Sequence, residues 1–76
     1  MKINPHEMAI KVLSRVYGKG DEEHVARLAE MLTGKTADHE TKTKAMAEVG
    51  RTLDGFRKVL DLMSELSMAV RHASKG

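Results

Sequence analysis

The sequence predicts an all-α protein, a small helical bundle with two short helices and one long C-terminal helix. Aromatic residues make up only 3% of the 76 residues, and Ala, Leu and Met supply most of the apolar side chains. This composition favours helices over strands. Apolar residues also recur at helical spacing in three stretches separated by glycine-containing turns. In the last stretch, eight residues alternate between spacings of three and four, and we call them the ladder: Met46, Val49, Leu53, Phe56, Leu60, Met63, Ser67 and Val70.

The first helix is predicted over residues 5–17. Asn4 can accept hydrogen bonds from the free backbone N–H groups of the first turn, and Pro5 suits that turn. The apolar side chains of this stretch cover more than half of the helix circumference, so we expect the helix to be largely buried. Gly18 is a natural end for it.

The second helix is predicted over residues 21–33, with Asp21 as its N-cap and Gly34 as its end. Glutamates follow Asp21 directly, where a negative charge interacts favourably with the helix dipole. Four apolar residues share one face of this helix and are expected to point inward: Val25, Leu28, Ala29 and Leu32.

The third helix is predicted over residues 37–73, capped by Thr36 or Asp38, which makes it roughly 55 Å long. Gly50 and Gly55 lie inside it, and each costs about 1 kcal/mol in a helix interior. One interpretation is a hinge that divides the segment into helices 37–49 and 51–73. We favour a continuous or gently bent helix, because the ladder keeps its spacing through both glycines.

A second apolar stripe runs beside the C-terminal half of the ladder. The two short helices are each only about 20 Å long, so we expect them to leave part of the long helix uncovered. One stripe is therefore expected to be core and the other an interface between two copies of the chain, although both stripes could be ordinary core. The predicted interface consists of Val59, Leu62, Leu66, Ala69 and Ala73 from the second stripe, with Phe56 and Met63 from the ladder.

Charged residues are nearly balanced, with 13 basic and 11 acidic side chains and a net charge of +2. A net charge this small does not by itself indicate a nucleic-acid partner. Acidic residues also alternate with the basic ones on the long helix, and that face has no aromatic side chain to stack on bases. The candidate nucleic-acid contacts, which we rank below protein association, are Lys42, Lys44, Arg51, Arg57 and Lys58.

Catalytic, cofactor-binding and metal-binding motifs are not found in the sequence. There is no Cys, and the four His residues show neither the i, i+4 spacing of a helical metal site nor an HExxH motif. We therefore expect no enzyme activity, no cofactor and no metal. The chain is expected to form one domain over residues 1–76. Its polar start and the lack of a long apolar run predict no leader, no membrane span and a cytoplasmic location.

The predicted function is that of a non-enzymatic protein-interaction module. An adaptor, a small chaperone or an inhibitor of a larger protein would act through an apolar face of the C-terminal helix. The expected partners are a second copy of the chain, giving a homodimer, and an unidentified larger protein. The alternative is a small nucleic-acid-associated transcriptional regulator that uses a basic helix face.

Overall fold

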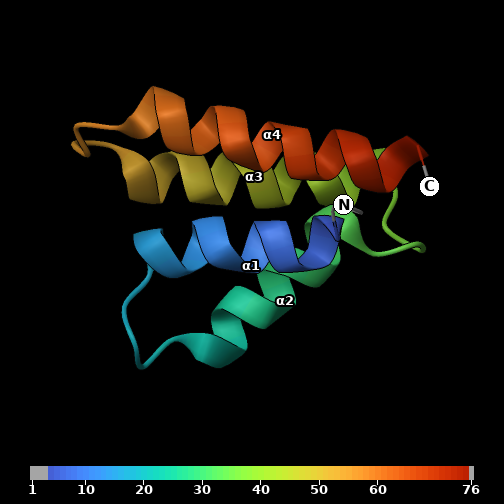
Figure 1. Ribbon diagram of the computed structural model, residues 1–76, viewed down its shortest axis with the longest axis horizontal. Helices are drawn as coiled ribbons and strands as arrows, with labels where there is room; N and C mark the ends of the chain where they lie inside the picture. Colours follow the sequence, from blue (N-terminus) through green and yellow to red (C-terminus); the bar gives the residue numbers. More distant parts are fainter. Residues whose placement is uncertain (1–3, 76) are drawn as a thin grey trace.

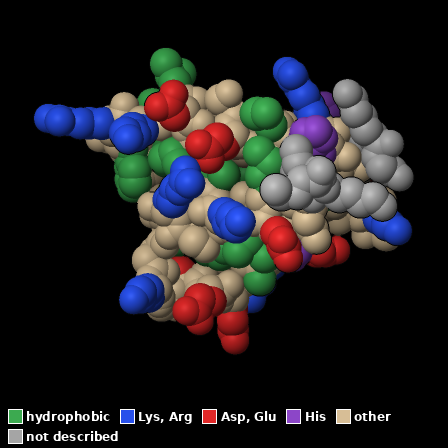
Figure 2. All heavy atoms as spheres, viewed as in Figure 1, with side chains coloured by type: hydrophobic (Ala, Val, Ile, Leu, Met, Phe, Trp, Pro, Cys, Tyr) green, Lys and Arg blue, Asp and Glu red, His purple; other side chains and the backbone are tan. Residues whose placement is uncertain are grey.

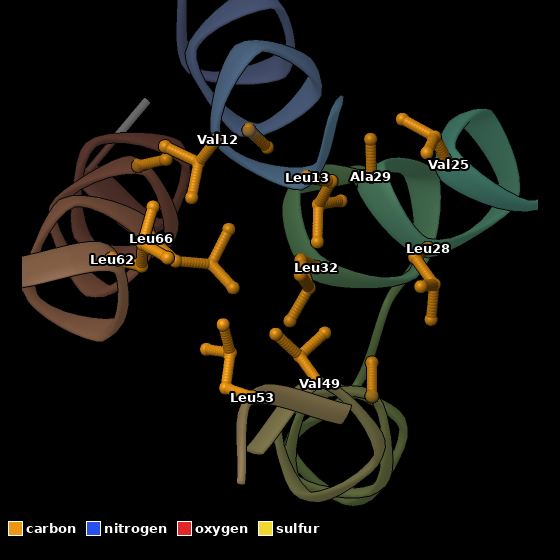
Figure 3. Packing of buried hydrophobic residues seen from close by; sticks show 13 residues of the cluster. Val12, Leu13, Val25, Leu28, Ala29, Leu32, Val49, Leu53, Leu62 and Leu66 are labelled. Atoms are coloured by element: carbon orange, nitrogen blue, oxygen red, sulfur yellow. The ribbon is translucent and has the colours of Figure 1, made fainter. Parts of the chain in front are cut away.

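The computed structural model describes residues 4–75, and over this range it is a small helical bundle of four helices. In chain order the helices are α1 (Pro5–Val16), α2 (Glu22–Thr33), α3 (His39–Leu53) and α4 (Val59–Lys75). They occupy the four corners of the bundle when it is viewed end-on (Figure 3). The predictions of one domain and of no leader also cover residues 1–3 and 76, which lie outside the described residues.

The predicted long helix over residues 37–73 is wrong, because the chain turns back between α3 and α4. The backbone of Gly55 has a φ of +93°, a left-handed conformation that residues with a Cβ rarely adopt. The alternative interpretation correctly divides the segment into two helices but places the break too early, because Gly50 remains inside α3 and the break follows Leu53. As a result α3 and α4 run antiparallel, and α4 extends back along α1 (Figure 1).

Polar side chains begin two of the helices. The Asn4 side chain accepts hydrogen bonds from the backbone N–H groups of His6 and Glu7, at 3.0 and 3.2 Å, which confirms its predicted capping role. Asp38 caps α3 by accepting a 2.8 Å hydrogen bond from the Thr41 backbone N–H. Asp21 precedes α2 but makes no side-chain capping hydrogen bond, so its predicted cap is not formed.

The Asp38 cap predicts a pH-dependent contribution to stability. The hydrogen bond from the Thr41 backbone N–H, joined by one from the Thr41 hydroxyl, lowers the pKa of Asp38 below 3.8. Since the pKa is lower in the folded chain, the stabilisation is complete above pH 3.8 and disappears as the pH falls through the folded-state pKa. We expect Asp38→Ala to lower the melting temperature at pH 7, and the difference from wild type to shrink in acid.

Asp38→Asn is the matched control, because Asn caps helices but does not titrate. Thermal melts of the three proteins from pH 7 to pH 2 measure the effect. If the gap between wild type and Asp38→Ala stayed constant over this range, the charged cap would have no role in α3.

The core draws small and branched apolar side chains from all four helices. The largest fully buried side chains are Leu13, Leu32, Leu53, Leu66, Val12 and Val49. Figure 3 shows labelled side chains of α1, α2, α3 and α4 pointing from different sides into one central cluster. The inner face predicted for the second helix is confirmed, since all four of its apolar residues are at most 4% exposed. Among the described residues, every buried side-chain N or O atom has a hydrogen-bond partner.

Candidate protein-interaction surface

Three residues of the predicted interface lie in the chain's own core. Leu62 is 8% exposed, and Leu66 and Ala69 are completely buried. The reason is the turn after α3, which shortens the last helix to 17 residues, or about 26 Å. α1 is about 18 Å long and packs along it. The sequence-based premise that the short helices leave the second stripe uncovered is therefore corrected for these three side chains.

The remaining predicted interface residues lie nearer the surface. Val59, Met63 and Ala73 are half-buried, and Phe56 in the turn before α4 is 42% exposed. Val59 and Met63 pack against the edge of the core. Of this group, Phe56 therefore offers the most free apolar surface for a partner.

Two exposed apolar residues were not assigned to the interface by the sequence pattern. Leu60 is 81% exposed and Met68 is 47% exposed. With Phe56 they are the large hydrophobic side chains that the structure exposes within residues 4–75. Leu60, Ser64 and Met68 follow one another at four-residue spacing, which places them on one side of α4. We call Phe56, Leu60, Ser64 and Met68 the α4 outer surface.

Both apolar stripes contribute to the core, and the residues that face solvent are not the ones the sequence suggested. The second stripe supplies the buried face of α4, and Leu60 from the ladder faces solvent. The ladder is still core in α3, where Val49 and Leu53 are completely buried. Gly55 is the signal in the sequence that could have indicated this. If one helix ends at Gly55, the next helix can bury a different face, so a single ladder no longer describes both helices.

Polar groups border the α4 outer surface. Arg15 of α1 and Glu65 of α4 form an ion pair at 3.1 Å. Beside them lies a surface hollow of about 670 Å³, which Phe56 also lines together with Arg57 and Lys58. Figure 2 shows hydrophobic side chains reaching the surface among mixed positive and negative groups, near the end of the bundle where α4 begins. Phe56 thus has a charged margin.

The five candidate nucleic-acid contacts do not form one row. Lys42 donates a 3.1 Å hydrogen bond to the Ser74 hydroxyl of α4. Lys44 and Arg51 line a groove of about 440 Å³ between α2 and α3. Arg57 and Lys58 line the separate hollow beside Phe56. A third basic side chain at the α2–α3 groove, Arg27, was missed because it comes from a different helix and shares no sequence pattern with the others.

The described residues show no cluster that could hold a metal ion, judged as three or more His, Asp or Glu side chains. None of the helices in residues 4–75 is both long and apolar enough to cross a membrane. No protein-family model, curated protein or solved structure matches this chain. Its function is therefore inferred from two surface features, the α4 outer surface and the α2–α3 groove.

Proposed function

We propose that this protein is a non-enzymatic interaction module that associates with a second copy of itself through the α4 outer surface. The observation that supports this most is the exposure of Leu60, of which 81% faces solvent. Burying a leucine side chain contributes about 1.5–3 kcal/mol. Met68 is exposed about two turns further along the same side of α4, and Phe56 is exposed in the turn before that helix.

The order of residues along α4 favours a second copy as the partner. Leu60 and Met68 lie at equal distances in sequence from Ser64. When two α4 helices cross antiparallel at Ser64, Leu60 of each copy faces Met68 of the other, as a two-fold interface requires. The small Ser64 side chains at the centre allow the helices to approach closely. This arrangement buries both exposed residues with one contact.

The test is to place charges on the surface without touching the core. We expect wild type to sediment at twice 8.4 kDa at micromolar concentration, and Leu60→Glu with Met68→Glu to sediment at 8.4 kDa. Both positions are exposed, so the variant should retain the helical circular dichroism of wild type. Ser14→Glu with Ala26→Glu is the matched control, because it adds the same charge at exposed helix positions elsewhere.

Two outcomes would contradict the proposal. One is a wild-type protein that remains at 8.4 kDa up to tens of micromolar. The other is a dimer that survives in Leu60→Glu with Met68→Glu, or that is lost equally in the control variant.

The alternative function, a nucleic-acid-associated regulator, has less support because its five basic residues are divided among three places on the bundle.

A further inference from the structure

The groove between α2 and α3 is the other large surface feature of the bundle. It has a volume of about 440 Å³ and is open to solvent. Its accessible floor is apolar: Ala47 of α3 is exposed, while Leu28 and Ala45 beneath it belong to the core and are already covered. Met31 lies half-buried beside them, and Met side chains adapt readily to a docked group. The groove therefore has an apolar base that an inserted side chain could cover.

The charges around this floor are mainly positive. Arg27 stands on the α2 side, and Lys44 and Arg51 stand on the α3 side. Lys44 lies 3.3 Å from Glu40, a neighbour on its own helix, and such exposed pairs are weak. The Glu48 carboxylate also lines the groove, where its oxygen lies 3.4 Å from the His24 ring. The rim thus carries more positive than negative charge.

We propose that the α2–α3 groove binds an acidic amphipathic helix of another protein. Lys44 and Arg51 are seven residues apart, about 10.5 Å along α3. Carboxylates at positions i and i+7 of a docked helix have the same separation. Apolar residues at i+3 and i+4 of that helix then face the floor at Met31 and Ala47, and Arg27 closes the other side.

Two observations favour a helix over a nucleic acid. The floor is apolar, so a phosphate backbone would leave it uncovered and unused. The residues lining the groove also include no Tyr, Phe or Trp on which a base could stack. A helix with both carboxylates and apolar side chains can pair with the basic side chains of the rim and also cover the apolar floor.

The groove and the α4 outer surface lie on different sides of the molecule. In the end-on view, α2 and α4 occupy opposite corners, and the α2–α3 gap lies away from α4 (Figure 3). A second copy bound at α4 therefore leaves the groove open. This inference does not depend on the proposed dimer, and the combination would make the protein a two-sided adaptor.

The test uses a synthetic helical peptide with Glu at positions i and i+7, Leu at i+3 and i+4, and Ala elsewhere. Fluorescence anisotropy at low ionic strength is expected to show saturable binding. Arg27→Glu with Arg51→Glu should weaken it at least tenfold, since charge pairs then become repulsive. Lys19→Glu with Lys35→Glu makes the same change in net charge at exposed positions outside the groove, and should bind as wild type does.

The monomeric variant Leu60→Glu with Met68→Glu should still bind the peptide, which separates this inference from the proposed dimer. Absence of saturable binding would overturn it. So would equal weakening in the two charge-reversed variants, or equal affinity for a peptide carrying Lys in place of its two Glu. Binding of duplex DNA, but not of the peptide, that is lost in Arg27→Glu with Arg51→Glu would instead assign the groove to phosphates.

Discussion

Replacing Leu66 by alanine is expected to lower the free energy of unfolding by about 3–5 kcal/mol. Replacing Leu60 by alanine is expected to change the free energy of unfolding of the monomer by less than about 0.5 kcal/mol. Both leucines belong to α4, but Leu66 is completely buried and Leu60 is 81% exposed. Truncating Leu66 removes its burial and leaves a cavity among tightly packed neighbours, whereas truncating Leu60 removes atoms that water already contacts.

Urea denaturation followed by circular dichroism measures this difference. A domain of this size is stabilised by roughly 4–11 kcal/mol, so Leu66→Ala should remove a large fraction of the total. Repeating the titration at several protein concentrations separates the intrinsic effect from any dimer, since association makes stability depend on concentration. Similar losses for the two variants, or a larger loss for Leu60→Ala, would mean that α4 presents its other face to the core.

The same distinction changes how charged substitutions are to be interpreted. Leu62→Glu with Leu66→Glu is an interface test only if those residues face a partner. Because both are buried in the chain's own core, the double substitution is expected to unfold the bundle. The charges that probe association belong at Leu60 and Met68 instead.

The two glycines of the predicted long helix are expected to respond to alanine with opposite signs. Gly50→Ala should raise the free energy of unfolding by about 1 kcal/mol, because alanine is the better helix former. A Cβ at Gly50 would meet nothing within 4 Å, so the gain is not lost to a clash. Gly55→Ala should lower the free energy of unfolding by about 1–2 kcal/mol, because its φ of +93° is unfavourable for a residue with a Cβ.

Urea titrations of both variants, with circular dichroism to record helix content, test the turn between α3 and α4. Gly50→Ala is the control for Gly55→Ala, since each replaces a glycine in the same part of the chain by the same residue. If Gly55→Ala instead raised both stability and helix content, residues 37–73 would form the continuous helix that the ladder suggests.

Local chemistry explains the features that were predictable. Asn4 begins α1 because its short polar side chain reaches free N–H groups two and three residues ahead. Val25, Leu28, Ala29 and Leu32 are buried because helical geometry puts them on one face, and one apolar face has to be covered. Both features depend on residues within a few positions of each other.

The break after α3 was not predictable by the same means. The ladder passes through Gly55 without a change in spacing, so periodicity carries no sign of the turn. A glycine in a helix interior costs only about 1 kcal/mol, so Gly55 by itself predicts neither a break nor a continuous helix. Tertiary contacts worth a few kcal/mol outweigh this helix propensity and decide between the two. In the folded chain α4 turns back along α1, which buries Leu62, Leu66 and Ala69 within the same molecule.

Composition, capping residues and helical periodicity were enough to predict an all-helical bundle, the extent of the first two helices and the buried face of the second. Contacts between distant helices fix where the last segment turns, which stripe of α4 is core and which basic side chains meet at the α2–α3 groove. The two kinds of interaction act over different distances along the chain. Capping and helical periodicity act between neighbours in the chain, whereas burial depends on which distant helix arrives to cover a face.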